Sequence, residues 1–171
     1  MNLLETGFEN LYLVEFFRML DDRGCFIKPW VRGLSESTFS SVDECYFSTS
    51  KAGTLRGLHF QSGEKSQKKF VVCLSGSIED VAVDLRPGSA TYQQVFRKRL
   101  DGFSNQGVLI PEGFAHGIFA WTDATIVNFC DKPYSPGDEG GVYWGSVPTL
   151  ADLPVIVLSE KDKGLPALSD I

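Results

Sequence analysis

Short runs of β-branched and aromatic residues, separated by turn-forming residues, are the feature that most constrains how this chain folds. Val, Ile and Phe are enriched in β-strands, whereas Gly, Pro, Asp and Ser favour the turns between strands. Many short strands at such spacing predict an antiparallel barrel or sandwich. In the centre of the chain these runs cover residues 69–74, 77–85, 94–100, 107–110, 117–121 and 124–129.

The N-terminal third also favours strands, over residues 11–17, 24–30 and 45–49. Helical signals are weaker: residues 37–43 predict a short turn, and Ser159 begins a capping-box-like segment that Gly164 and Pro166 soon end. With 171 residues the chain can bury one substantial core. We therefore predict an all-β fold with minor short helices, in a single domain over residues 1–171.

Composition and charge exclude several classes of partner and location. The formal net charge of −6, from 16 Lys and Arg against 22 Asp and Glu, gives no broad basic surface for nucleic acid. No apolar run approaches the ~20 residues that cross a membrane. The acidic start of the chain lacks the features of a signal peptide, which predicts a cytoplasmic protein.

The four cysteines are Cys25, Cys45, Cys73 and Cys130, and no two of them form a CxxC pair. In a protein without a secretion signal, scattered cysteines of this kind are expected to stay reduced. Free cysteines are also among the most buried residue types. We expect all four to be small apolar residues of the interior.

Only two histidines occur, His59 and His116, and each lies in an apolar segment beside glycines. A lone histidine in such a place is more often a hydrogen-bonded core residue, but two of them with Arg56 close by indicate a site. Asp80 and Asp84 lie in a loosely alternating strand pattern, so each could face a barrel interior or the solvent. The sequence pattern does not distinguish between an interior and a solvent-facing position for either aspartate.

Metal binding is the main rival use of histidine inside a β-barrel. Metal sites in such barrels commonly begin with a His-x-His pair, and here Gln61 stands two positions after His59. Two histidines also cannot supply three imidazole ligands. The sequence therefore favours acid–base chemistry without a metal or another cofactor.

Basic side chains gather near His59 in an otherwise acidic protein. Arg56 precedes it, and Lys65, Lys68 and Lys69 follow it. Arg and Lys side chains bind phosphate, so a phosphorylated small molecule is the expected ligand. For Lys65 and Lys68, a solvated loop over residues 64–68 is the simpler explanation.

Seven motifs, in order along nearly the whole chain, resemble the dTDP-4-dehydrorhamnose 3,5-epimerase family. The resemblance implies a cupin-type antiparallel jelly-roll barrel, usually a homodimer, that works without a metal. It also implies a nucleoside-diphosphate 4-keto-6-deoxy sugar as substrate. The motifs are residues 21–24, 56–61, 80–86, 110–117, 134–136, 139–141 and 158–162.

The same resemblance assigns roles by position. His59 corresponds to the family's general base, and Asp162 to the carboxylate that pairs with it. Lys69, Arg56 and His116 correspond to residues around the sugar and its developing enolate, which positive charge or a hydrogen-bond donor stabilises. The other positions that it places in substrate binding are Arg23, Lys28, Glu44, Tyr46, Gln61, Phe129, Tyr134, Glu139 and Lys161. Of these, Tyr134 is the aromatic expected to stack on the nucleotide base.

The chain departs from the family pattern at the catalytic tyrosine. Thirteen residues after His116, where the family has the acid that protonates the opposite face of the sugar, the count reaches Phe129, and a one-residue shift would place Asn128 there. Phenylalanine cannot donate a proton. Water or another side chain, such as Tyr46 or Cys130, would then return the proton, or the enzyme would invert only one centre.

Three further departures leave the nucleotide open between dTDP, GDP and CDP. Lys28, Glu44 and Tyr46 stand where the family usually has Glu, Gln and Asn, which changes the hydrogen bonds offered to a base. The leading hypothesis is epimerisation at C3, C5 or both. The alternatives are a 3,4-ketoisomerase, which Gln61 disfavours, and a catalytically impaired nucleotide-sugar-binding module.

Overall fold

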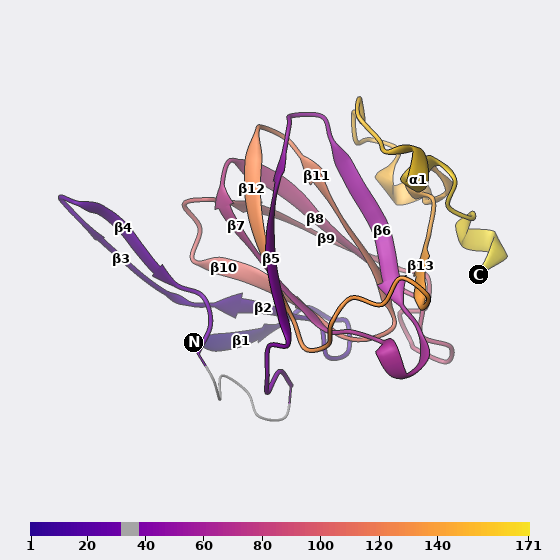
Figure 1. Ribbon diagram of the computed structural model, residues 1–171, viewed down its shortest axis with the longest axis horizontal. Coiled ribbons are helices and arrows are strands. Elements are labelled where there is room, and N and C mark those ends of the chain that lie inside the picture. Colours follow the sequence, from indigo (N-terminus) through magenta and orange to yellow (C-terminus); the bar gives the residue numbers. More distant parts are fainter. Residues whose placement is uncertain (32–37) are drawn as a thin grey trace.

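The computed structural model describes residues 1–31 and 38–171, and most of its strands form two antiparallel sheets that face each other (Figure 1). The first sheet has the order β1 (Asn2–Glu5), β2 (Tyr12–Glu15), β10 (Gln106–Ile110), β7 (Lys69–Ser75), β12 (Ala124–Cys130) and β5 (Glu44–Ser50). The second has the order β13 (Glu139–Gly141), β6 (Leu55–Gln61), β11 (Phe114–Ala120), β8 (Ser77–Asp84) and β9 (Val95–Asp101).

Helices are few and short, so the predicted all-β jelly-roll barrel with minor helix is confirmed. The one α-helix among the described residues is α1 (Glu160–Lys163), which Ser159 caps as the sequence predicts. The 3₁₀ turns are η1 (Gly63–Lys65), η2 (Trp144–Ser146), η3 (Pro148–Leu150) and η4 (Leu168–Asp170). No helix in residues 1–31 and 38–171 is long and apolar enough to cross a membrane.

Alternation along the strands sends side chains to opposite faces of each sheet. Between the sheets, Val71 and Ile126 of the first sheet pack with Ala82 and Ile118 of the second. These side chains close one part of the barrel. Lys69 lies two residues from Val71 on β7, and Asn128 lies two residues from Ile126 on β12, so each points to the same face as its neighbour. Lys69 and Asn128 face an open part of the interior instead.

The outer faces of both sheets are covered by further apolar clusters. A C-terminal segment from Val142 to Leu168 packs over β6 and β11, burying Leu58 and Phe119 (Figure 1). On the other side, Phe70 and Phe39 are buried against the first sheet. Because both faces of the barrel are covered, the segments that carry the site are held in place by packing.

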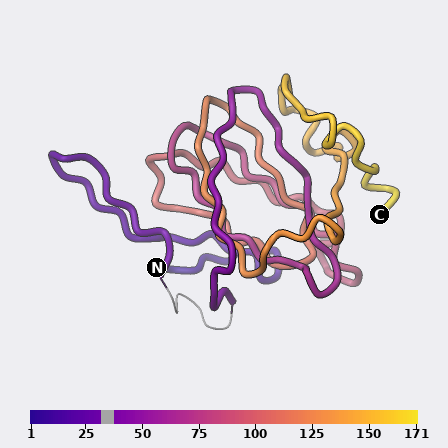
Figure 2. The backbone as a smooth tube through the Cα atoms, viewed as in Figure 1, coloured from indigo at the N-terminus to yellow at the C-terminus, as the bar shows by residue number. Residues whose placement is uncertain are grey.

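A two-stranded hairpin of β3 (Phe17–Asp21) and β4 (Gly24–Lys28) projects away from the barrel (Figures 1 and 2). Its side chains include exposed apolar residues, with Leu20 63% and Phe26 51% exposed. Arg23 lies in the turn of this hairpin and pairs with Asp21 at 2.6 Å. The hairpin therefore carries an uncovered apolar surface.

Several expectations need correction. The strand predicted over residues 11–17 is divided between β2 and β3, because Phe16 is buried in the core beneath the first sheet. Strands β1, β6 and β13 were not anticipated. Of the turn predicted over 37–43, Ser37 lies outside the described residues, Thr38 is in a turn, and Phe39 is already in a β-bridge.

The expectation that all four cysteines are interior residues is wrong for two of them. Cys73 and Cys130 are buried, but Cys25 and Cys45 are exposed. Cys25 lies on the projecting hairpin, and Cys45 on β5, which forms one end of the first sheet. Both positions leave the thiols outside the core.

Candidate active site

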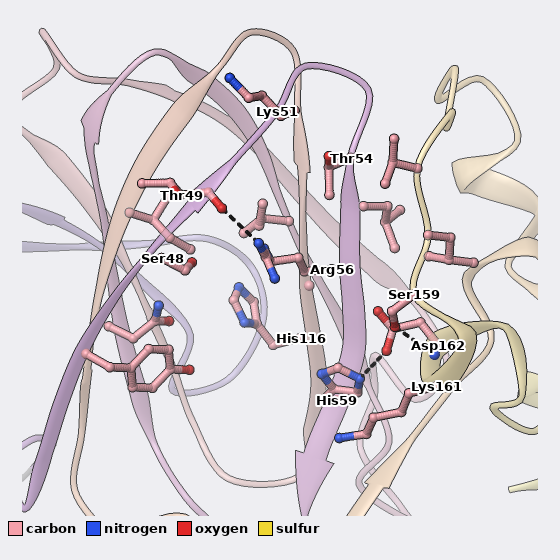
Figure 3. Close-up of a pocket in the computed structure, with 18 of the residues that line it drawn as sticks. Ser48, Thr49, Lys51, Thr54, Arg56, His59, His116, Ser159, Lys161 and Asp162 are labelled. Atoms are coloured by element: carbon pink, nitrogen blue, oxygen red, sulfur yellow. Dashed lines mark hydrogen bonds and ion pairs between the residues drawn. The ribbon is translucent and has the colours of Figure 1, made fainter.

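A cavity of about 610 Å³ lies in the open part of the barrel (Figure 3). One wall comes from β6, β11 and the C-terminal segment, and the other from β5, β7 and β12. A second hollow of about 350 Å³ shares Tyr46, His59, Lys69 and Lys161 with it, so the two are continuous at these residues. The space is within the range typical of small-molecule sites.

A β-bulge in β6 turns two functional side chains into this cavity. His59 pairs with His116 and Arg56 pairs with Ile118, so β6 has one residue more than β11 over this stretch. Gly57 adopts a φ of +118°, and a Cβ there would lie 2.7 Å from the carbonyl oxygen of His116. Only glycine fits, and as a result Arg56 and His59 line the same cavity despite their odd spacing.

The C-terminal segment brings a carboxylate to His59. His59 Nε2 lies 2.8 Å from Oδ1 of Asp162, which is 4% exposed (Figure 3). The amide of Gly57 donates to Oδ2 of the same carboxylate at 3.3 Å, and the amide of Asp162 donates to Oγ of Ser159 at 3.1 Å. The carboxylate is thus held by the bulge on one side and by the helix cap on the other.

This pairing fixes what the imidazole can do. An ionised carboxylate only accepts hydrogen bonds, so Nε2 carries the proton and the lone pair is on Nδ1. Among the described residues, Nδ1 of His59 has no protein partner. His59 therefore presents a basic nitrogen that is not used by the fold.

Four cationic side chains line the same space, and one of them, Lys51, is held in an ion pair with Asp123. Arg56 reaches across to β5, where Nε donates to Oγ of Ser50 and Nη2 to the carbonyl of Thr49, both at 2.8 Å. Lys69 enters from β7, and desolvation lowers the pKa of its amine below the ordinary lysine value. Lys161 pairs with Glu139 at 2.6 Å. Together they make an otherwise acidic protein locally favourable for anions.

His116 is backed by a buried acid of its own. Its Nε2 lies 3.0 Å from Oδ2 of Asp80, and Asp80 is fully buried. Asp84 is also fully buried and bonds Arg86. The solvent-facing alternative for both aspartates is therefore wrong, although neither carboxylate lines the cavity: Asp80 lies behind His116 and Asp84 supports a turn.

The second hollow holds four further residues predicted for binding, namely Glu44, Gln61, Tyr134 and Glu139. Glu139 accepts from the hydroxyl of Tyr134 at 2.6 Å as well as from Lys161. Desolvation acts to raise the pKa of Glu139, but these two hydrogen bonds outweigh it and the pKa lies below its usual value. Glu139 is thus an anion that fixes both neighbours.

Gln61 and Glu44 are committed mainly to the backbone. Gln61 is 5% exposed, donates to the carbonyl of Lys65 at 2.7 Å and accepts from the amide of Ser135 at 2.8 Å. The carboxylate of Glu44 accepts from the amide of Tyr134 at 2.6 Å. Their clearest effect is to position the loop that carries Tyr134.

Three predicted site residues are not brought to the cavity. Phe129 is wrong as a cavity residue: its ring stacks on Phe70 on the opposite face of the sheet, and the neighbouring Asn128 faces the interior. Arg23 and Lys28 lie on the projecting hairpin and line neither hollow. Phe129 points away from the cavity because successive side chains of β12 point to opposite faces of the sheet. Arg23 and Lys28 lie outside the cavity because the hairpin that carries them is separate from the barrel.

Sequence reasoning raised Asn128 only through the one-residue shift, and it missed other polar lining residues, among them Ser48, Thr49, Lys51, Thr54 and Ser159. Alternation from Tyr46 along β5 would have indicated Ser48. No local signal marks Thr54, which enters the site at the turn before β6 and bridges to Val157 of the C-terminal segment.

Comparison with known proteins places these observations in context. A model of the dTDP-4-dehydrorhamnose 3,5-epimerase family matches residues 5–170. The dTDP-4-dehydrorhamnose 3,5-epimerase of Methanothermobacter thermautotrophicus is 36% identical over 168 residues, which cover 94% of this chain and 90% of the relative.

Solved structures of similar epimerases have the same fold as this chain. A Legionella pneumophila dTDP-6-deoxy-D-glucose-3,5-epimerase, in complex with dTDP-4-keto-L-rhamnose, superposes with a TM-score of 0.92 at 32% identity, covering 99% of this chain and 94% of that one. ChmJ, a 3'-monoepimerase from Streptomyces bikiniensis in complex with dTDP-quinovose, gives 0.87 at 28% identity over 96% and 86% of the two chains.

Proposed function

Because the chain belongs to the dTDP-4-dehydrorhamnose 3,5-epimerase family, we propose that His59 is the base with which it epimerises a nucleoside-diphosphate 4-keto-6-deoxy sugar. The protein is an enzyme of the isomerase class. The observation that carries the role of His59 is its 2.8 Å contact with the buried Asp162 at the point where the two hollows join.

In the first step, Nδ1 of His59 removes the proton from a carbon next to the C4 ketone. Asp162 stabilises the imidazolium that forms, because the carboxylate already accepts from Nε2. General-base catalysis of this kind contributes about 10²–10⁴-fold to the rate. The electrons of the broken C–H bond move onto the ketone oxygen as an enolate.

The enolate needs donors near its oxygen. Lys69 and His116 both line the cavity, and Arg56 spans its two walls. Donors that are already oriented stabilise a developing oxyanion without reorganisation. We assign Lys69 to this charge first, since the described residues give its amine no hydrogen-bond partner of its own.

The nucleotide occupies the second hollow in this proposal. Tyr134 is 50% exposed there, which leaves its ring available to stack on a base, while Lys161 offers charge to the diphosphate. The relatives' names point to dTDP as the nucleotide to test first. GDP and CDP forms are the comparison, because Glu44 and Tyr46 replace the usual residues.

The decisive experiment is solvent exchange. The purified protein in D₂O is given 4-keto-6-deoxy sugars carried on dTDP, GDP and CDP, and NMR follows deuterium at C3 and C5 and the stereochemistry of the product. We expect deuterium at one or both carbons with inversion, and loss of both signals in His59→Asn. Absence of exchange with all three nucleotides would leave the binding-module alternative in its place, and carbonyl transfer to C3 would indicate the ketoisomerase.

The projecting hairpin suggests a homodimer. The hairpin is an arm that extends away from the barrel of its own chain (Figure 1). Its apolar side chains are exposed, and Arg23 lies in its turn. In a dimer, the arm can pack on the partner and carry Arg23 and Lys28 toward the partner's second hollow. Sedimentation equilibrium tests the dimer, and a monomer at micromolar concentration would contradict it. An unchanged KM in Arg23→Ala would contradict the contribution of the arm to the partner's second hollow.

A cytoplasmic location is also proposed. The four cysteines are free, and two of them are exposed, which suits a reducing compartment. Cell fractionation checks this, and recovery of the protein outside the cytoplasm would contradict it.

A further inference from the structure

Inversion of a carbon centre requires proton transfer on both faces of the sugar ring, and the two walls of the cavity come from different sheets. His59 belongs to β6 of the second sheet. A ring held between the walls presents its other face to β5, β7 and β12. A group that returns a proton to that face must therefore come from the first sheet.

Few side chains of the first sheet line the cavity and can give up a proton. Ile126 and Asn128 cannot act as acids, and the hydroxyls of Ser48 and Thr49 are far weaker acids than a phenol. Cys130 is fully buried and does not line the cavity. Tyr46 and Lys69 remain.

Tyr46 occupies the position that this step needs. It is one of the four residues shared by both hollows, as is His59. Asn128 of β12 lies directly opposite it in the strand register, so the two side chains point to the same face of the sheet. Among the described residues its hydroxyl has no hydrogen-bond partner, whereas the hydroxyl of Tyr134 is bound to Glu139.

We propose that Tyr46 is the catalytic acid that protonates the enolate on the face opposite His59, an inference that rests on the epimerase function proposed above. The phenol O–H bond breaks, its proton forms the new C–H bond, and the enolate electrons supply that bond as the ketone is restored. The phenolate then takes a proton from water, and His59 returns the proton it abstracted to solvent.

The ionisation of Tyr46 agrees with this geometry. Desolvation, together with the nearby Cys130, Glu44 and Glu139, raises the pKa of its phenol above the ordinary tyrosine value. The cation nearest to Tyr46 in the strand register is Lys69, which is aligned with Cys130 and Glu44, two residues along the strands from Tyr46. The phenol is therefore protonated at neutral pH, as a proton donor must be.

Tyr46→Phe separates the two half-reactions. The variant keeps His59, so it should still exchange the substrate proton for deuterium in D₂O at a rate within about tenfold of the wild type. Formation of the inverted product should fall by about 10²–10⁴-fold, the usual contribution of a positioned acid. Lys69→Met provides the contrast, because loss of the enolate's cation should slow exchange and inversion together.

The matched control is Tyr92→Phe, which removes a phenol that lines neither hollow and is 41% exposed. It should epimerise at the wild-type rate. Wild-type inversion in Tyr46→Phe would overturn the proposal, and so would equal loss of exchange and inversion when circular dichroism and nucleotide affinity are unchanged. A wild-type protein without exchange would instead overturn the epimerase function itself.

Discussion

Replacing Asp162 with asparagine tests the buried His59–Asp162 pair with the smallest change in shape. The carboxylate accepts from Nε2 of His59 at 2.8 Å and from the amide of Gly57 at 3.3 Å. An asparagine side chain can keep the contact with Gly57 through its carbonyl oxygen. Its NH₂ group then faces Nε2, so the imidazole must carry its proton on Nδ1, the nitrogen that serves as the base.

The expected loss combines the wrong tautomer with a missing counter-charge. We expect deuterium exchange in Asp162→Asn to fall by about 10²–10⁴-fold, which is about 3–5 kcal/mol in activation free energy. The unfolding free energy should fall by about 1.5–3 kcal/mol, the usual value of one hydrogen bond to a charged group. NMR exchange rates and urea denaturation measure the two quantities separately.

Glu160→Gln is the matched control. It makes the same chemical change on the same helix, but the side chain is 89% exposed and, within residues 1–31 and 38–171, pairs only with Lys163. Its exchange rate should stay within twofold of the wild type, as expected for a surface ion pair. An exchange rate for Asp162→Asn within tenfold of the wild type would refute the role of the pair in setting the tautomer.

Two further substitutions test the supporting structure. Gly57→Ala should lower the unfolding free energy by about 1–3 kcal/mol and remove most of the activity, because its Cβ would meet the backbone of His116 and its φ of +118° is strained for alanine. Gly137→Ala is the control, since the space around Gly137 is open. Denaturation and deuterium-exchange assays should show no change in its stability or its activity. Desolvation acts to raise the pKa of Asp84, but hydrogen bonds from Arg86, Ser89 and Thr91 outweigh it and hold the pKa well below its ordinary value. The contribution of Asp84 to stability is therefore present above about pH 4, and it is lost as the pH falls through the pKa of Asp84 in the folded protein. Asp84→Asn should therefore lose about 3–5 kcal/mol at pH 7, and the difference from wild type should shrink in denaturation curves below pH 4; a constant difference would contradict this.

The regular strands of the barrel could be predicted because their chemistry is local. The runs at 69–74 and 77–85 correspond closely to β7 and β8, where every second side chain enters the core. Strand β6 could not be predicted, since its bulge at Gly57 breaks the alternation that identifies a strand. The three-residue β13 is formed by Glu and two glycines, which have no strand preference of their own.

The two histidines could be singled out because the chain has no others, and the resemblance to the epimerase family assigned Asp162 and Lys69 by position. His59, Asp162, Lys69, Arg56 and His116 were all identified by sequence, and the fold gathers them around one cavity. Phe129 was misplaced because a residue count cannot tell which of two neighbours in a strand faces inward. The register settles it: Asn128 faces inward, opposite Tyr46.

The general base and its carboxylate partner come from distant parts of the chain. His59 and its carboxylate partner are 103 positions apart, and the partner arrives on a segment that packs over β6 after the barrel strands. A chain that ends before residue 162 lacks the carboxylate that sets the tautomer of His59. We expect such a chain to exchange the substrate proton about 10²–10⁴-fold more slowly than the chain that carries Asp162, as in Asp162→Asn.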